Sequence, residues 1–384
     1  MRLVFVNYEY PPIGAGAATA TAEMARSAAR LGHEVTVLTS AFGSNFGWSR
    51  DGEVTLRRVR SRRERADQSS IGEMASFVIR AALALPGVVR RSRAQACIVF
   101  FSLPCGPLGT LFRLISGRPY VVSLRGGDVP GTEPQLYGMH RRLRFVRRFV
   151  LSRAAAVVAN SPGLAALSES ADSIAVKFIP NGVDLERFRP PAHRPSEPFH
   201  FLFVGRLNEQ KNVGLLLEAV AELSRSANRP FRVSIVGDGP LRDSLRQRAT
   251  LLELDRLVNW VKWLPREQMP AVYQSAHCVI NPSHYEGMPN VVLEAMACAV
   301  PVIVSNVSGN RDVVEDGKSG LVVTHDSREG LVEAMARALR EPAYIERLGA
   351  SARGFVAERY SWDATTLQYI DLLARGAESE TLGN

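Results

Sequence analysis

The stretch from Asn281 to Pro301 reads NPSHYEGMPNVVLEAMACAVP and decides how the second half of the chain is interpreted. Cys278–Asn281 is a short apolar run of the kind that forms a buried parallel strand. A turn with Gly287, Pro289 and Asn290 follows, and the residues after it have the composition of a helix. The turn should present backbone N–H groups at a helix N-terminus, which suits a phosphate or sugar hydroxyls.

Two carboxylates flank this turn. Glu286 stands in the loop and Glu294, eight residues later, inside the predicted helix. Helix geometry places them roughly 10–12 Å apart, which is too far for an acid/base pair that acts on one bond. The spacing suits two hydroxyl-bearing parts of one long ligand. Taken singly, each residue is also explained as an ordinary exposed loop or helix Glu.

Strands and helices alternate on both sides of this stretch. Predicted strands of the first half are Leu3–Val6, Val35–Leu38, Ile98–Phe101, Tyr120–Leu124 and Ala156–Ala159. Those of the second half are His200–Val204, Arg232–Val236, Val258–Trp260, Cys278–Asn281, Val302–Ser305 and Leu321–Val323. Such alternation predicts an α/β protein with parallel sheets covered by helices.

A proline-rich segment, Arg189–Pro198, separates the two halves, because four prolines in ten residues exclude a helix or a central strand. We predict two Rossmann-like domains facing across a cleft, joined by a linker at 191–198. The second domain spans 199–357. In such sheets ligands bind at the carboxyl ends of the strands.

Three more motifs follow predicted strands. Arg206 and Lys211, after Gly205, are two cations five residues apart that could neutralise a pyrophosphate; alternatively they are surface residues of a loop. Gly237 and Asp238 belong to a Gly-Asp-Gly-Pro segment that allows close backbone approach to a flat ligand such as a base, or is simply a turn.

The third motif contains Gly14 and Gly16, after the first strand. Two features argue against a dinucleotide-binding fingerprint at this loop. Gly14 lies seven residues beyond Asn7, so the turn is not tight on the strand, and no acidic residue follows the second strand to bind a ribose.

Together these motifs resemble the E-x(7)-E family of retaining glycosyltransferases, which has the GT-B fold, and the resemblance covers nearly the whole chain. It implies that Glu286 contacts the donor sugar and Glu294 the nucleotide ribose. It assigns the diphosphate to Arg206 and Lys211. The sugar is further held by the backbone of the turn after Glu286, formed by Gly287, Met288, Pro289 and Asn290.

The same resemblance places Gly237 and Asp238 beside the nucleotide base, and the Gly14–Gly16 loop opposite the donor phosphate and the acceptor. It implies that the last helix, after Tyr360, crosses back, so that the first domain is 1–190 plus 358–384. The resemblance also implies that the configuration of the anomeric carbon is retained. No residue stands out as a covalent nucleophile, so the hypothesis taken from the family is that the acceptor attacks from the side of the leaving group.

Three positions depart from the family. Ala299 stands where Gly is usual, from which we expect a small packing change, and Lys262 replaces another Gly near the base, which leaves UDP, GDP or ADP open. Arg125 replaces a His that approaches the transferred sugar, and Arg cannot act as a base. Arg125 is therefore assigned to an anionic acceptor and Asp128 to an acceptor hydroxyl, with a structural salt bridge between the two as the alternative.

Charge is uneven along the chain. Residues 1–190 contain 26 Lys and Arg against 14 Asp and Glu, whereas residues 191–384 contain 21 against 24. The basic half predicts an anionic partner. Within His140–Arg153 we place Leu143, Val146 and Val150 on one helical face and Arg141, Arg144 and Arg148 on another, which is typical of contact with an anionic membrane or of a buried face with solvated arginines.

The remaining features narrow the class of protein. We expect a cytoplasmic protein, peripheral on the inner membrane face if the basic helix binds lipid, since no apolar run reaches spanning length. The four cysteines should be buried free thiols. No cofactor is expected, and no metal, because the Asp-x-Asp pattern of metal-dependent transferases is absent.

The function predicted is transfer of a hexose from a nucleoside diphosphate sugar to an acceptor hydroxyl, in polysaccharide or glycolipid synthesis. The acceptor would be a glycan or a lipid-linked molecule. One alternative is a non-catalytic nucleotide-sugar-binding module on the same fold. Nucleic-acid binding is the other, but no recognition motif or aromatic array supports it.

Overall fold

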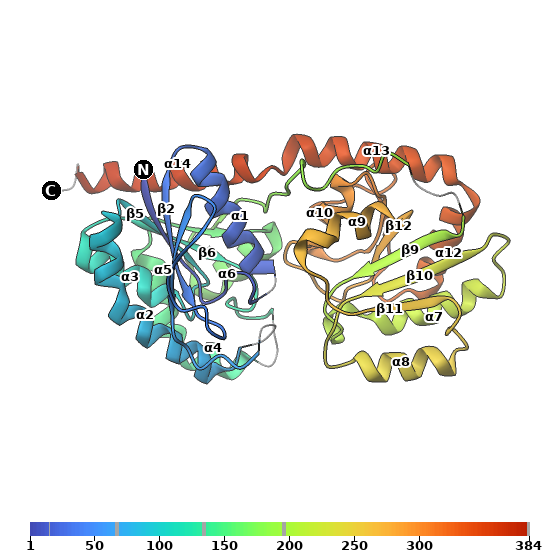
Figure 1. The fold of residues 1–384 in the computed structure, drawn as a ribbon, viewed down its shortest axis with the longest axis horizontal. Coiled ribbons are helices and arrows are strands. Elements are labelled where there is room, and N and C mark those ends of the chain that lie inside the picture. The colour runs from blue at the N-terminus through green and yellow to red at the C-terminus, as the bar shows by residue number, and fades with distance from the viewer. Residues whose placement is uncertain (15, 66–68, 133–135, 194–196, 382–384) are drawn as a thin grey trace. The chain divides into compact units, whose positions relative to one another are not determined.

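The computed structural model describes residues 1–14, 16–65, 69–132, 136–193 and 197–381, which form two compact units (Figure 1). Unit 1 is Met1–Gly182 with Trp362–Asn384, and unit 2 is Val183–Ser361. The chain therefore passes from one unit to the other at Gly182, before the proline-rich segment. The expected linker 191–198 belongs to unit 2, and its residues 194–196 lie outside the described residues.

Unit 1 is built on an eight-stranded sheet in the order β3-β4-β2-β1-β5-β6-β7-β8. All neighbouring strands pair parallel except β3 and β4. The strands are β1 (Arg2–Val6), β2 (Glu34–Ser40), β3 (Gly47–Asp51), β4 (Val54–Val59), β5 (Ala96–Phe100), β6 (Tyr120–Leu124), β7 (Ala156–Ala159) and β8 (Lys177–Phe178). Its helices are α1 (Gly16–Arg30), α2 (Ile71–Ser92), α3 (Gly106–Ser116), α4 (Tyr137–Arg142), α5 (Arg144–Arg153), α6 (Pro162–Asp172) and α14 (Trp362–Thr381).

Unit 2 is built on a six-stranded parallel sheet in the order β11-β10-β9-β12-β13-β14. The strands are β9 (Phe199–Val204), β10 (Phe231–Val236), β11 (Val258–Val261), β12 (Cys278–Asn281), β13 (Val302–Ser305) and β14 (Leu321–Val323). Its helices are η2 (Glu209–Lys211, 3-10), α7 (Val213–Ser224), α8 (Arg242–Leu251), η3 (Arg266–Gln268, 3-10), α9 (Met269–Gln274), α10 (Asn290–Ala297), α11 (Ser308–Arg311), α12 (Arg328–Arg340) and α13 (Pro342–Arg359).

The strand order of unit 2 reverses between β9 and β12. From β9 the chain adds β10 and β11 on one side, and from β12 it adds β13 and β14 on the other. Loops that leave the carboxyl ends of β9 and β12 therefore diverge and leave room between them, which is where open α/β sheets bind ligands. The prediction of two Rossmann-like α/β units is confirmed.

The last helix, α14, completes unit 1, as expected from the resemblance. It packs on α1 and β6, and its Asp363 carboxylate accepts hydrogen bonds from Ser27 at 2.6 Å and Arg30 at 2.8 Å. Farther along, the Tyr369 hydroxyl lies 2.6 Å from Ser123 Oγ inside the core. A break at Tyr360–Ser361 separates α14 from α13, so the last helix begins at Trp362, two residues after the predicted start at Tyr360.

The helix α2 corrects one expectation. By length and composition it could cross a membrane, with a mean hydropathy of 1.4 over the best window, although no such segment was anticipated. In the structure it packs on α3 and β2 through Phe77, Ala81 and Leu85, which are buried. Ile79 and Leu83 on its other side are 63% and 79% exposed.

The predicted amphipathic helix at 140–153 is two helices, α4 and α5, separated at Leu143. Of the three apolar residues placed on one helical face, Val150 is buried, whereas Leu143 and Val146 are exposed. The buried cation is Arg147, whose guanidinium binds both carboxylate oxygens of Asp172 at 2.8 and 2.9 Å. The exposed side of α5 is therefore both apolar and basic.

The four cysteines, Cys97, Cys105, Cys278 and Cys298, are free and buried, as predicted. Burial raises the pKa of the Cys97, Cys105 and Cys278 thiols. They serve as small apolar side chains of the two cores.

Candidate functional site

The loop after β9 carries the two cations of the predicted diphosphate site. Arg206 is partly buried, and its Nε atom is enclosed without a hydrogen-bond partner among the described residues. Lys211 ends the short helix η2, and its Nζ lies 2.5 Å from the Glu286 carboxylate. Lys211 is thus paired with a carboxylate, whereas the Nε–H of Arg206 has no hydrogen-bond acceptor among the described residues.

The Glu286 carboxylate is the centre of a small network at the carboxyl end of β12. Its Oε1 atom accepts from Lys211 Nζ, from Ser283 Oγ at 2.8 Å and from Asn281 Nδ2 at 3.2 Å. The side chain is only 6% exposed. Because β9 and β12 are neighbours, the sheet order brings together Lys211 and Glu286, which are 75 residues apart.

The other carboxylate, Glu294, has a different partner. It lies in α10, where its Oε2 accepts a hydrogen bond from the Tyr273 hydroxyl at 2.8 Å. Burial, with help from the nearby Glu294 charge, raises the pKa of Tyr273 well above its ordinary value, so Tyr273 acts as a permanent donor. Glu286 is thus held by Lys211, Ser283 and Asn281, and Glu294 by Tyr273.

The turn between the two carboxylates leads directly into α10. Pro289 is the N-cap residue, and no side chain caps this helix. Met288 is buried in the core of unit 2, while Gly287 and Asn290 are partly exposed. The backbone of the turn therefore borders the same loop as Glu286, with a helix N-terminus that favours anionic or hydroxyl ligands.

The glycines after β10 are required by the neighbouring loop. A Cβ at Gly237 (φ 149°) would lie 1.9 Å from the Gly205 carbonyl oxygen, and one at Gly239 would lie 2.4 Å from the Leu207 carbonyl oxygen. The sequence predicted that these glycines allow a ligand to approach the backbone closely. In the structure it is the loop after β9 that lies against them. Asp238 is exposed, and its carboxylate accepts a hydrogen bond from the N–H of the adjacent Gly239 at 2.8 Å.

Two exposed side chains, Lys262 and Trp263, follow β11. Their strand is tied to the β10 loop by a hydrogen bond from Gly237 N to Val261 O at 3.0 Å. The departure from the family at Lys262 therefore lies next to the loop that the resemblance assigns to the base.

In unit 1 the glycine loop is also sterically fixed. Gly14 has a φ of 89°, and a Cβ there would lie 2.6 Å from the Glu9 carboxylate. Gly16 is the exposed first residue of α1. Glu9 is itself buried and paired with Arg63 at 3.4 Å.

Arg125 and Asp128 do not form the salt bridge considered as an alternative. The Asp128 carboxylate is buried and accepts backbone N–H bonds from Ser102 at 2.6 Å, Arg125 at 2.9 Å and Gly126 at 3.1 Å. Burial raises its pKa despite these bonds. Asp128 therefore holds the loop together, and its assignment to an acceptor hydroxyl stays a prediction.

The Arg125 side chain turns toward another residue, Asn181, whose Oδ1 accepts from Nη1 at 2.6 Å. Its guanidinium also lies over the Phe100 ring, with 4.9 Å to the centroid, and its Nε has no partner among the described residues. Burial lowers its pKa, and the group stays cationic.

Sequence reasoning missed three residues of these networks, Asn281, Ser283 and Tyr273, and it did not foresee that Asn181 would contact Arg125. Asn281 and Ser283 stand in the stretch that decided the interpretation, directly after a strand, and could have been found there. Tyr273 and Asn181 come from distant segments, and only the fold brings them to Glu294 and Arg125.

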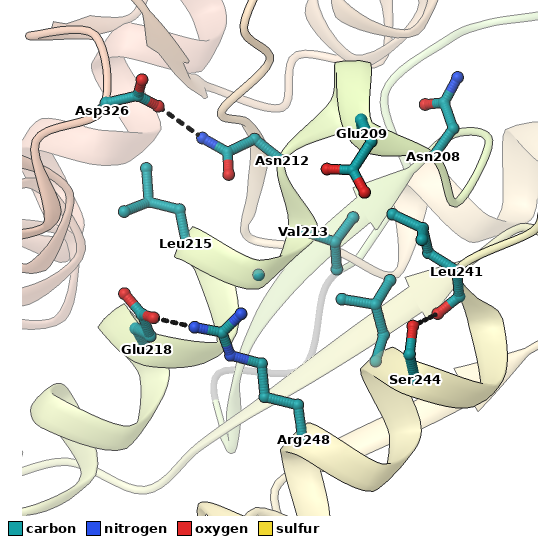
Figure 2. Close-up of a pocket in the computed structure, with 12 residues that line it drawn as sticks. Asn208, Glu209, Asn212, Val213, Leu215, Glu218, Leu241, Ser244, Arg248 and Asp326 are labelled. Carbon is teal, nitrogen blue, oxygen red and sulfur yellow. Dashed lines mark hydrogen bonds and ion pairs between the residues drawn. The ribbon is translucent and has the colours of Figure 1, made fainter.

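A cavity of about 420 Å³ lies between α7 and α8 (Figure 2). It shares only Asn208, Glu209 and Asn212 with the loop after β9, and none of the predicted donor-binding side chains lines it. Figure 2 shows the Glu218–Arg248 ion pair across its floor. The cavity is therefore distinct from the networks around Glu286 and Glu294.

Comparison with protein families gives matches over both units. Residues 184–355 match the family model of glycosyl transferases group 1, and residues 15–182 match the glycosyl transferase 4-like domain. Among curated proteins, a D-inositol 3-phosphate glycosyltransferase of Frankia alni is 36% identical over 212 residues, which cover 51% of this chain and 52% of that protein. The chain spans about half the length of the curated relatives it matches first.

Solved structures match nearly the whole chain. Sucrose-phosphate synthase from Thermosynechococcus elongatus has a TM-score of 0.82 at 22% identity, covering 97% of this chain and 98% of that one. Anabaena HepE, solved in complex with UDP and glucose, has a TM-score of 0.77 at 19% identity, covering 98% and 100%. These similarities establish a shared fold.

Proposed function

Because the chain belongs to the group 1 glycosyl transferases, we propose that it transfers a sugar from a nucleoside diphosphate sugar to an acceptor hydroxyl with retention of configuration. The observation that carries the proposal is the Lys211–Glu286 pair at the point where the strand order of unit 2 reverses, with Arg206 on the same loop as Lys211. A loop that carries a guanidinium and one half of a Lys–Glu pair suits a ligand that bears both phosphate and hydroxyl groups.

Each side chain has a distinct part in this proposal. Arg206 binds the diphosphate through its guanidinium group. Lys211 is shared between the diphosphate and Glu286, so that a bound phosphate frees carboxylate oxygens for the sugar hydroxyls. Glu294, oriented by the Tyr273 hydroxyl, accepts from the ribose hydroxyls. The turn Gly287–Asn290 adds backbone N–H groups next to the sugar.

In the reaction, the bond from the anomeric carbon to the diphosphate breaks and a bond to the acceptor oxygen forms on the same face. The acceptor proton leaves with the diphosphate, whose charge Arg206 and Lys211 neutralise. NMR of the product tests retention: a product with the donor's anomeric configuration is expected. An inverted product, or a trapped glycosyl-enzyme adduct, would contradict this mechanism.

Donor binding is tested by a thermal-shift screen of nucleoside diphosphate sugars, with UDP-glucose first because the HepE structure holds UDP and glucose. The best donor should raise the melting temperature, and Arg206→Ala should remove most of that rise. Arg246→Ala, an exposed cation on α8, serves as the matched control. An unchanged shift in the Arg206 variant would refute the diphosphate assignment.

Unit 1 is proposed to handle the acceptor. Arg125 is the residue that we assign to an anionic acceptor, because it is a cation that stands where the family has a His. The Asn181 amide and the Phe100 ring fix the guanidinium. A glycan or lipid-linked phosphate acceptor fits this cation, and either would place the reaction in polysaccharide or glycolipid synthesis.

We also propose that unit 1 contacts an anionic membrane from the cytoplasmic side. Three adjacent helices, α2, α3 and α5, expose large apolar side chains. Those more than 60% exposed are Ile71, Ile79 and Leu83 on α2, Leu114 on α3 and Phe145 on α5. Exposed arginines accompany them on α5, where Arg144 and Arg148 flank Phe145.

This combination of apolar and cationic side chains is what binds a lipid interface. Each arginine near an anionic surface contributes about 1 kcal/mol. The protein should sediment with vesicles of phosphatidylcholine and phosphatidylserine, and less in high salt. Phe145→Ser should weaken this binding, whereas Leu251→Ser, equally exposed on α8 of unit 2, should not. Equal binding to vesicles of phosphatidylcholine alone would contradict the role of the arginines.

A further inference from the structure

Two histidines and an aspartate meet beside the loop that carries Glu286. His284 precedes it in the segment after β12, and His325 and Asp326 follow β14. One ligand atom from each lies within 4.8 Å of the others. His284 Nδ1 lies 3.1 Å from Oδ1 of Asp326, and His325 Nε2 lies 3.1 Å from Oδ2 of the same carboxylate. The two rings are nearly perpendicular, with centroids 5.4 Å apart.

These histidines differ from others in the fold. The ring nitrogens of His200 lie 2.8 Å from Ser275 O and Ser234 Oγ. Those of His140 face Gly127 O and the Arg147 guanidinium. In both cases the imidazole completes a buried hydrogen-bond network. His284 and His325 are instead partly exposed, and each has a ring nitrogen directed at the same carboxylate.

Two imidazoles and a carboxylate form a donor set typical of Zn²⁺ and related transition-metal ions. Tetrahedral Zn²⁺ with bonds of about 2.0–2.2 Å places its ligand atoms roughly 3.3–3.6 Å apart. Each imidazole nitrogen lies 3.1 Å from one of the two oxygens of Asp326, close to this range. The side chains are 35%, 40% and 51% exposed, so small rotations can bring the three ligand atoms into range and leave a coordination position for water.

A fourth residue orients the carboxylate. Asn212 Nδ2 donates to Asp326 Oδ1 at 2.8 Å, as Figure 2 shows. Hydrogen bonds of this kind to ligating groups fix their direction and increase metal affinity. Asn212 is also the residue that links η2 to α7.

From this geometry we propose that His284, His325 and Asp326 form a site for one divalent transition-metal ion of the Zn²⁺ class. The expected absence of a metal rested on the missing Asp-x-Asp pattern of donor-binding metals, and it stays a prediction for the transfer reaction. The site proposed here is formed by other residues and does not depend on the proposed function.

Metal binding at this position has a mechanical consequence. The His284 backbone N–H donates to Gln210 O at 2.8 Å, and Gln210 Nε2 donates to Tyr285 O at 3.0 Å. Glu286 follows immediately and pairs with Lys211. An ion that joins His284 to the loop after β14 therefore restrains the short segment that positions Glu286, and couples its rigidity to metal availability.

The test uses the full, untagged chain after chelator treatment. Calorimetric titration with Zn²⁺ should show one equivalent bound, and Co²⁺ should give the intense visible absorption of a four-coordinate ion. His284→Ala and His325→Ala should each weaken Zn²⁺ binding at least tenfold, and Asn212→Ala by a smaller factor. His193→Ala, an exposed histidine elsewhere in unit 2, should bind Zn²⁺ as the wild type does.

Two further measurements separate loss of the site from loss of the fold. Melting curves without metal check that each variant is folded. Hydrogen exchange should slow at residues 284–287 when Zn²⁺ is added to the wild type but not to His325→Ala. Wild-type protein that binds no stoichiometric Zn²⁺, or histidine variants that bind it unchanged, would overturn the proposal.

Discussion

A substitution at Gly309, which is not itself one of the proposed donor-binding residues, should displace the loop that carries Glu286. This buried residue of α11 packs against the loop backbone, so that an added Cβ would lie 2.3 Å from Gly287 O and 2.6 Å from Glu286 O. Ordinary carbon–oxygen contacts are about 3.3 Å, and Gly309→Ala must therefore displace the loop by about 1 Å. Overpacking of this kind costs about 1–3 kcal/mol.

The displacement should affect function more than stability. Glu286 would move relative to Lys211, and a misplacement of about 1 Å can lower a rate roughly 100-fold. The assay is kcat/KM for transfer from the donor that gives the largest thermal shift, together with the melting temperature. Transfer efficiency should fall roughly 10- to 100-fold, on the order set by that misplacement, and the melting temperature should be lower by roughly 3–10 °C.

The matched control is Gly354→Ala. This exposed glycine lies within α13, and a Cβ there meets nothing within 4 Å. The control should leave kcat/KM unchanged and stabilise the protein by about 0.5–1 kcal/mol. If Gly309→Ala has the kinetics of Gly354→Ala, the loop around Glu286 does not position the donor and the reasoning is refuted.

Three predictions concern stability. Arg147→Ala leaves Asp172 buried without its partner and should lower the free energy of unfolding in urea by about 3–5 kcal/mol. The control Arg148→Ala removes an exposed arginine and should lower it by less than about 0.5 kcal/mol. Equal effects of the two substitutions would contradict a stabilising role of the buried pair. Ala299 has a φ of 53°, so Ala299→Gly should stabilise by about 0.5–1 kcal/mol, and a loss of stability would show that the left-handed backbone carries no cost. Burial lowers the pKa of His200 to about 4; because the unfolded chain takes up this proton near pH 6.5, stability should fall by up to roughly 3 kcal/mol between pH 6.5 and 4, and the fall should be smaller in His200→Gln.

Ala299 also shows how a family departure acts. A small change in packing was expected where glycine is usual. The structure instead places this residue after α10 with a left-handed backbone. The cost therefore arises from the closeness of the Cβ to the carbonyl oxygen that follows it, and not from neighbouring side chains.

The sequence predicted best those features whose cause is local. The strand Cys278–Asn281 and the strands at 120–124, 156–159, 302–305 and 321–323 have the predicted bounds, because buried parallel strands are short apolar runs between turn residues. The strand β3 was missed because GWSRD is exposed and lacks an apolar alternation. The strand β4 was missed although its buried residues Val54 and Leu56 alternate with polar ones.

Pairings between distant segments could not be predicted. Lys211 and Glu286 were each assigned to a donor, but their contact depends on β9 lying next to β12. Arg147 looked like one more arginine of a basic helix, and only the position of Asp172 makes it a buried residue. For Asp128, the backbone amides that occupy its carboxylate are visible only in the folded loop.

The central claim is that one activated sugar is held by Arg206, Lys211, Glu286 and Glu294. A crystal structure of the full chain soaked with the best nucleoside diphosphate sugar tests it directly. The diphosphate should lie within hydrogen-bond distance of Arg206 and Lys211, the ribose on Glu294 and the sugar on Glu286. Donor density elsewhere, for example in the cavity beside Arg248, with these four side chains unaltered, would contradict the claim.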